Sequence, residues 1–312
     1  MQISLMLFIQ IVKLFLMIFM GYLLVRVKVL KISDASVLSV ITLYLIVPCL
    51  ILSAFQIERT PERTRGLLMA YAAAVFINFV LLFLGRVCAK IFRLSPVEQA
   101  SAIYPNAGNM IVPIITSLLG KDMVIYACAF MTVQILFFWT HLRSLLCGET
   151  KPDWKKILTN INIIAVAAGI LFYFFQFRIP SVVGDALSSV GSMIGPMSMI
   201  ITGMLIAGAD LRKIFSTPRA YFVSFLRLIL FPLCTLPFVV LFAKGSGLKE
   251  ANMILLITYL AAMAPCASTT TQMAQIFHKD AEYAGVLNVM SVIFCIVTMP
   301  LLIGLYSFIL PV

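Results

Sequence analysis

The sequence predicts an all-α polytopic membrane protein whose ten transmembrane helices form a 5+5 inverted repeat with two broken, crossing helices. Three observations predict this fold class. The chain has 312 residues, of which 62% are hydrophobic and only 11% charged. Apolar windows of about 20 residues, the length that crosses a bilayer, recur along nearly the whole chain. Two of these windows are interrupted by proline and small polar residues, at corresponding places in the two halves.

The apolar windows define ten spans that follow one another with short polar connections. Residues 3–25 are too long for a signal-peptide core and lack a basic leader, so we expect a retained first helix. The polar stretch 147–156 is a linker that divides the chain into repeats at 1–146 and 157–312, and five spans per repeat give the repeats opposite orientations. The predicted spans are 3–25, 35–55, 66–87, 97–119, 123–146, 157–177, 182–209, 218–243, 249–277 and 281–310.

The loop charges predict the orientation of these spans. With the N-terminus outside, the cytoplasmic loops carry about twice as many Lys and Arg residues as the outer loops, as the positive-inside rule requires. We therefore expect both termini outside, with the net charge of +11 explained by loops that face lipid headgroups. The sequence contains no basic run with interleaved aromatic residues, the pattern that would indicate a nucleic-acid partner.

The seven cysteines are scattered through apolar segments and form no CxxC pair. They are typical of small buried hydrophobic residues, and we predict no disulfide frame, no metal site and no cofactor.

The fourth span contains Pro105, Asn106, Gly108, Asn109 and Pro113 within nine residues. The prolines free backbone hydrogen-bonding groups, the asparagines supply amide donors and acceptors, and glycine lets another backbone approach closely. The N-terminus of a half-helix adds a positive dipole end. These features predict an uncharged binding site for a carboxylate, although Asn106 could instead join helices by hydrogen bonds.

The ninth span is broken at Pro265 and continues with Ser268, Thr269 and Gln272, all able to donate hydrogen bonds. At membrane depth a broken helix survives only where protein or a cavity covers it. Paired breaks in two halves indicate the binding site of a secondary transporter, near the bilayer midplane. The alternative is a pair of ordinary proline-kinked helices.

Two cations lie inside predicted spans, Lys13 in the first and Arg227 in the eighth. Burying either one costs about 2.5–3.5 kcal/mol on insertion scales. Each either snorkels to a membrane interface or attracts an anionic substrate into the pathway.

The acidic residues lie in loops or near helix ends, with Glu98 and Asp210 nearest the membrane interior. A proton or sodium relay usually needs a carboxylate at depth, so the sequence favours uncoupled transport. HExxH, GxSxG and P-loop motifs are absent from the sequence. Gly208-Ala209-Asp210 is similar to part of an aspartyl protease signature, but the second acid that this chemistry requires is missing. We therefore predict no enzymatic activity.

These motifs resemble those of the auxin efflux carrier family, which includes bacterial malate and malonate permeases and plant PIN auxin carriers. The resemblance covers essentially the whole chain, and departs from the family pattern at Met110 and Ile111, where a second glycine is common. It rests on the ten spans and on three motifs: Pro105-Asn106-Ala107-Gly108-Asn109 with Pro113, Ala264-Pro265-Cys266-Ala267-Ser268, and the run from Asn288 and Ser291 to Pro300.

The resemblance implies the fold of bile-acid symporters and sodium/proton antiporters. Helices one, two, six and seven would form a scaffold that supports a homodimer, and helices three to five and eight to ten would form a mobile transport domain. The broken helices would carry a small organic anion in an elevator motion, in the bacterial plasma membrane. Two alternatives stay open: a sodium- or proton-coupled symporter on the same fold, and a membrane sensor that binds a ligand without moving it.

Overall fold

The computed structural model describes residues 2–148, 154–208, 212 and 215–311. Throughout these residues the regular secondary structure is helical, apart from one isolated antiparallel bridge between Pro105 and Cys266. Six segments in the described residues are long and apolar enough to cross a membrane: Asp34–Ala54, Pro61–Phe92, Lys121–Cys147, Ser181–Gly208, Pro218–Ser246 and Ala281–Ile309.

Helices occupy every predicted span, and the fourth and ninth are interrupted. The ten-span inverted repeat and its division into scaffold and transport domains stay predictions. In the first half the helices are α1 (Gln2–Arg26), α2 (Asp34–Ile41), η1 (Thr42–Ile46), α3 (Val47–Ala54), α4 (Pro61–Phe92), α5 (Pro96–Ile103), η2 (Ala107–Ile111), α6 (Val112–Leu118), η3 (Lys121–Met123), α7 (Val124–Phe137), η4 (Phe138–Leu142) and α8 (Arg143–Cys147).

The second half is helical in the same pattern, with short connections between long helices. It contains α9 (Trp154–Leu158), α10 (Ile161–Phe175), α11 (Ser181–Ser192), α12 (Ile194–Gly208), α14 (Pro218–Phe225), η5 (Leu226–Leu230), α15 (Phe231–Ser246), α16 (Ala251–Met263), α17 (Ser268–Ile276) and α18 (Ala281–Ile309).

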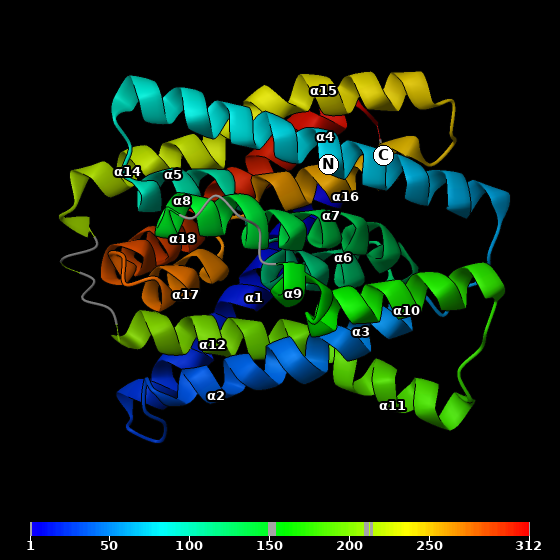
Figure 1. Ribbon diagram of the computed structural model, residues 1–312, viewed down its shortest axis with the longest axis horizontal. Coiled ribbons are helices and arrows are strands. Elements are labelled where there is room, and N and C mark those ends of the chain that lie inside the picture. Colours follow the sequence, from blue (N-terminus) through cyan, green and yellow to red (C-terminus); the bar gives the residue numbers. More distant parts are fainter. Residues whose placement is uncertain (1, 149–153, 209–211, 213–214, 312) are drawn as a thin grey trace.

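The helices pack in two groups that lie against each other. Figure 1 shows α4 and α15 along one side of the molecule and α2, α3, α11 and α12 along the opposite side, with α5 to α7 and α16 to α18 between them. In the first group α1, α2, α3, α10, α11 and α12 pack mainly on one another; the second contains α4 to α8 and α14 to α18. The groups meet where α6 and η2 contact α1 and α12, and where α7 contacts α3 and α10.

Backbone contact between α1 and α12 holds the first group together. A Cβ atom on Gly203 would collide with the carbonyl oxygen of Ile18, and a Cβ atom on Gly21 would collide with that of Ile200. Glycine at both positions therefore lets the two helix backbones approach to direct van der Waals contact. Close approach through small residues is how helices gain van der Waals packing in a membrane.

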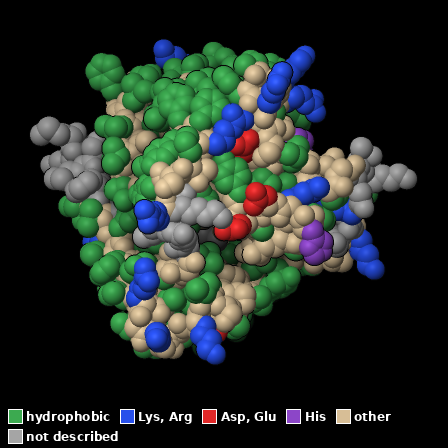
Figure 2. All heavy atoms as spheres, turned by 90° about the vertical axis from the view of Figure 1, so that its left-hand side faces the viewer, with side chains coloured by type: hydrophobic (Ala, Val, Ile, Leu, Met, Phe, Trp, Pro, Cys, Tyr) green, Lys and Arg blue, Asp and Glu red, His purple; other side chains and the backbone are tan. Residues whose placement is uncertain are grey.

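Figure 2 shows the end of the molecule at which α14 and α17 lie. Lys and Arg side chains are spread over this end face and outnumber acidic ones, while hydrophobic side chains cover much of the flank. This is the end at which the sequence places the cytoplasmic loops, so the charges match the predicted orientation without testing it.

Two glycine-to-alanine variants test the α1–α12 contact. We expect Gly203→Ala to lower the melting temperature in detergent, because overpacking costs about 1–3 kcal/mol. Gly304→Ala is the matched control, since a Cβ there meets nothing within 4 Å and alanine stabilises a helix interior by about 0.5–1 kcal/mol relative to glycine. Equal melting temperatures for the two variants would contradict this packing.

Candidate functional site

The two helix breaks cross and pair with each other. The peptide N–H of Asn106 donates to the carbonyl of Pro265 at 2.7 Å, and that of Ala267 donates to the carbonyl of Tyr104 at 2.9 Å. Each proline forces the preceding residue out of the helical conformation, so Tyr104 has φ −96° and ψ 113°, as expected before a proline. The local sequence breaks the helices, and the pairing across the chain places the breaks against each other.

Side chains from neighbouring helices satisfy the remaining backbone groups of the crossing. The Gln134 amide donates to the carbonyl of Pro105 at 2.5 Å. Asn288 donates to the carbonyl of Cys266 at 2.6 Å, and Ser291 accepts from the N–H of Cys266 at 3.0 Å. Polar residues of the fifth and tenth spans therefore join these helices to the crossing by hydrogen bonds. Backbone N–H and C=O groups that were expected to bind a ligand are therefore hydrogen-bonded within the protein instead.

The C-terminal ends of α5 and α16 converge on the side chain of Arg227, which lies in η5. Its guanidinium donates to the carbonyls of Ala264 at 2.9 Å, Ala102 at 3.1 Å and Ile103 at 3.0 Å, and also to that of Ala262. The side chain is 0% exposed. The expected snorkelling of Arg227 is therefore wrong: the last carbonyls of two broken helices, which lack intrahelical partners, bind it in the interior.

This arrangement leaves the crossing electropositive. A helix end carries roughly half an elementary charge, negative at the C-terminus and positive at the N-terminus. The guanidinium of Arg227 balances the two C-terminal ends that it contacts. The N-terminal ends of η2 and α17 lie on the other side of the crossing, and the N-cap residues, Asn106 and Ala267, make no side-chain capping hydrogen bond. Uncapped helix N-termini that face a cavity bind anions.

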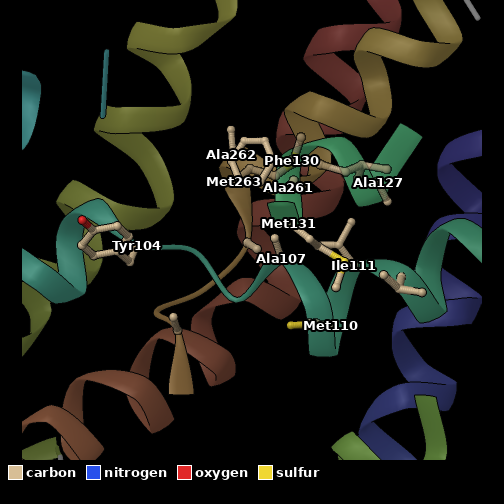
Figure 3. Packing of buried hydrophobic residues seen from close by; sticks show 14 of the residues in the cluster. Tyr104, Ala107, Met110, Ile111, Ala127, Phe130, Met131, Ala261, Ala262 and Met263 are labelled. Atoms are coloured by element: carbon tan, nitrogen blue, oxygen red, sulfur yellow. The ribbon is translucent and has the colours of Figure 1, made fainter. Parts of the chain in front are cut away.

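Apolar side chains hold the crossing from behind. Ala261 and Met263 at the end of α16 lie beside Phe130 of α7 (Figure 3). All three are buried. Close packing of this kind excludes water from the rear of the crossing and strengthens the electrostatic effect of the helix ends.

Two adjacent cavities, which share lining residues, open in front of the crossing. The larger has a volume of about 270 Å³ and the smaller about 100 Å³, and both contain Asn106, Thr269 and Gln272. No charged side chain lines either one among the described residues. The wall of the larger cavity is aromatic and apolar, with Tyr44 from η1 and Trp139 from η4. The cavity is thus a largely apolar pocket with a few convergent polar groups, the usual form of a small-molecule site.

Four π-helical turns surround the crossing: η1, η2, η4 and η5. The first and third line the larger cavity, the second forms its rim, and η5 carries Arg227. π-turns interrupt regular helices and are frequent at functional sites. Sequence patterns had given no indication of them.

The structure does not bring all the predicted site residues together. The structure brings together Pro105, Asn106, Gly108, Ser268, Thr269 and Gln272 at these two cavities. Pro265 is buried within the crossing itself. Pro113 and Lys13 line a different cavity, and Arg227 lines none of the cavities described here. The side chain of Asn109 and residue Asp210 lie outside the described residues.

Asn160 and Asn162 complete the larger cavity and were missed in the sequence. Asn160 caps α10, with its Oδ1 accepting from the N–H of Asn162 at 3.0 Å. Both lie near the start of the predicted span 157–177, shortly after the polar linker. The available signal was an asparagine pair at the start of an otherwise apolar helix.

Glu98, the other acid near the interior, uses its carboxylate for hydrogen bonds within the fold. Its carboxylate accepts from Arg219 Nε at 2.8 Å and from the Tyr283 hydroxyl at 3.1 Å, and its second oxygen accepts from the N–H of Ser95 at 2.8 Å. With Ser95 it forms a capping box at the start of α5. These contacts tie α5, α14 and α18 together at one end of the second group.

A third cavity, of about 570 Å³, opens on the far side of the crossing between the two helix groups. Its floor contains Pro113 of α6 and Gly195 of α12. A Cβ atom on Gly195 would lie 3.1 Å from the Cβ of Pro113, so these elements touch. Leu50 of α3 lines this cavity and Val47, one turn away, lines the two smaller ones. Along α3, the lining of the third cavity and that of the two smaller cavities are therefore about one helical turn apart.

Removal of the Arg227 side chain tests the crossing. We expect Arg227→Met to lower the free energy of unfolding by at least about 3 kcal/mol, because it leaves four buried carbonyls without a donor. Arg227→Lys keeps the charge but not the planar fork, so its loss should be intermediate. Thermal unfolding in detergent measures both, with exposed Arg65→Met as the control. Equal melting temperatures for Arg227→Met and Arg65→Met would exclude this role.

Comparison with known proteins agrees with the all-helical, apolar architecture. No curated protein matches the chain. The sequence model of the family described as "membrane transport protein" matches twice, at residues 6–152 and 149–303, and the two matches meet within the polar linker 147–156. Together they cover nearly all of the chain. The resemblance to auxin efflux carriers is confirmed: this chain belongs to the auxin efflux carrier family of membrane transport proteins.

Proposed function

We propose that the protein is a secondary carrier of a small organic anion, which binds by its carboxylate in front of the crossing. The observation that carries this proposal is the cavity without charged side chains in its described lining, to which Asn106 and Thr269, at the start of α17, both contribute. The positive ends of helices favour a negative ligand. Membership of a transporter family supports movement of the ligand rather than chemical change.

The groups at the cavity suit a carboxylate. Such a ligand accepts hydrogen bonds only, and bonds from backbone N–H groups and amides to an ionised acceptor are stronger than neutral ones. The Asn106 and Gln272 amides and the Thr269 hydroxyl supply donors, and Gly108 lets the ligand approach the backbone. The absence of a lysine or arginine from the described lining favours reversible over very tight binding, as a carrier needs.

The size of the cavity limits the ligand. A volume of about 270 Å³ lies near the lower end of the range for small-molecule sites. The aromatic and apolar wall at Trp139 and Met131 accommodates the carbon skeleton of the acid. We therefore expect a short-chain or single-ring organic acid in the malate, malonate or auxin class.

Alternating access follows from cavities on both sides of a thin barrier. We propose that the second helix group slides as a transport domain along the first, which acts as the scaffold. Asn106 and Pro113 are separated by seven residues, which corresponds to roughly 10 Å along a helix. A displacement of that size would bring Asn106 to the level that Pro113 occupies at the floor of the third cavity, and so expose the anion to the opposite side.

The carrier is proposed to work as a uniporter in the plasma membrane, with both termini outside and as a homodimer. The described lining of the two smaller cavities contains no carboxylate, and proton or sodium relays in membranes usually use one. A coupled symporter on the same fold is the alternative that the transport assay separates.

The transport assay uses purified protein in liposomes, with sodium and pH equal across the membrane. Transient currents are recorded on addition of malate, malonate, succinate, lactate or indole-3-acetate. A saturable current without an ion gradient supports the uniporter. A current that appears only with an imposed sodium or proton gradient would replace it with the symporter, and silence for all acids under all gradients would contradict the proposed substrate class.

Substitution of Asn106 tests the site itself. We expect Asn106→Ala to lower transport at least about tenfold, equivalent to about 1.4 kcal/mol of binding, with an unchanged melting temperature. The Asn106→Asp side chain has nearly the same shape but places a like charge beside the carboxylate of the ligand, so this variant should transport even more slowly than Asn106→Ala. Asn252→Ala is the control, since that amide donates to the carbonyl of Pro311 far from the cavities. Normal transport by well-folded Asn106→Ala would rule out this site.

Substitution of Gly195 tests the sliding step. Gly195→Val adds a branched side chain against Pro113, and overpacking of about 1–3 kcal/mol in the moving interface should slow transport about tenfold or more. Gly304→Val, at an open position of α18, should leave transport unchanged. Equal rates for the two variants would show that α6 does not move along α12.

A further inference from the structure

The charge of Lys13 lies too deep in the predicted membrane span to reach an interface by snorkelling. It lies midway along α1, roughly 17 Å from the start of the helix, which is farther than a lysine side chain reaches. Its side chain is exposed to the third cavity, and it has no hydrogen-bond or ion-pair partner among the described side chains. A free ammonium at membrane depth is tolerated where it faces a water-filled cavity, and such residues mark ion or substrate pathways.

The third cavity contains more positive than negative charge. Besides Lys13 it is lined by Lys121, Arg178, Asp122 and Asp185. Asp122 is paired with a residue outside the cavity, Arg63, at 3.3 Å. Three cations therefore face a single remaining carboxylate, that of Asp185. Walls of low dielectric constant focus such an excess of charge and raise the local concentration of anions.

Neutral donors accompany these cations. One face of α11 presents serines to the cavity, among them Ser188, whose Oγ lies 3.3 Å from Lys121 Nζ, and Ser192. An apolar membrane helix with hydroxyl groups along one face is adapted to a hydrated cavity rather than to lipid. The volume of about 570 Å³ lies within the range of ligand sites.

The position of this cavity links it to the carrier site. Gly195 and Pro196 of α12 line it, while Ser198, less than one turn away, lines the smallest cavity beside Asn106. Lys13 is on the first helix group, which the proposed motion leaves in place. An anion that leaves Asn106 on this side, or arrives there, thus meets Lys13 on the stationary wall.

We infer that the third cavity is a second anion-binding site, in which Lys13 Nζ is the charge partner of the ligand and which prefers dicarboxylates to monocarboxylates. Its role in the transport cycle rests on the proposed function, whereas its affinity for anions does not. The preference follows from charge: more than one cation is available, and a second carboxylate gains a second partner, while Asn106 and its neighbours offer uncharged donors only.

A cysteine reporter on the cavity wall tests this inference in the full-length protein in detergent. Ser192→Cys is labelled with 2-sulfonatoethyl methanethiosulfonate, with labelling of the native cysteines subtracted. We expect malonate to slow the labelling, and propionate, its analogue with one carboxylate, to slow it much less at equal ionic strength. In the Lys13→Gln background about tenfold more malonate should be needed, equivalent to about 1.4 kcal/mol.

Two further backgrounds make the result specific. Lys244→Gln removes an exposed lysine that lines none of these cavities and should leave protection by malonate unchanged. Asn106→Ala should lose transport but keep protection, which separates failure of the carrier site from failure of this one. Two results would overturn the inference even if transport is normal. One is that malonate does not slow labelling of Ser192→Cys in the protein that keeps Lys13. The other is that malonate slows labelling equally after Lys13→Gln.

Discussion

The structure depends on the need to satisfy backbone hydrogen-bonding groups where two helices break at membrane depth. A polar group left unpaired in an apolar interior costs several kcal/mol, and each break exposes several of them. The chain meets this need from three sources: pairing of the breaks with each other, amide and hydroxyl side chains of adjacent helices, and the guanidinium of Arg227. The position of the crossing, and with it the shape of the cavity, follows from these bonds.

The same bonds support the proposed preference of the site for an anion, although its described lining contains no lysine or arginine. Carbonyl ends of two helices are turned toward Arg227 and neutralised there, behind close apolar packing. The amide ends point the other way and keep their partial positive charge. Helix ends of opposite sign on the two sides of the crossing favour negative charge on the side of the cavity, and in the proposed carrier Asn106 and Thr269 orient the ligand there.

In the proposed carrier, the arrangement of the cavities supplies the second requirement, access from two sides. A wall, about one helical turn thick along α3, separates the cavities beside Asn106 from the cationic cavity beside Lys13. Gly195 of α12 meets Pro113 of α6 at this wall, and glycine has no side chain that could interlock with its neighbour. In the proposed mechanism this interface slides, whereas the α1–α12 contact within the first helix group, built on Gly21 and Gly203, stays fixed.

The sequence alone determined the helices, the two breaks and the polar residues beside them, because apolar length, proline chemistry and local composition act over a few residues. It also indicated the family. Only the tertiary structure decided the role of Arg227, whose partner Ala102 lies 125 residues away, the separation of Pro113 and Lys13 from Asn106, and the contribution of Asn160 and Asn162. These depend on which helices meet and at what depth, and packing of distant segments leaves no periodic trace in the chain.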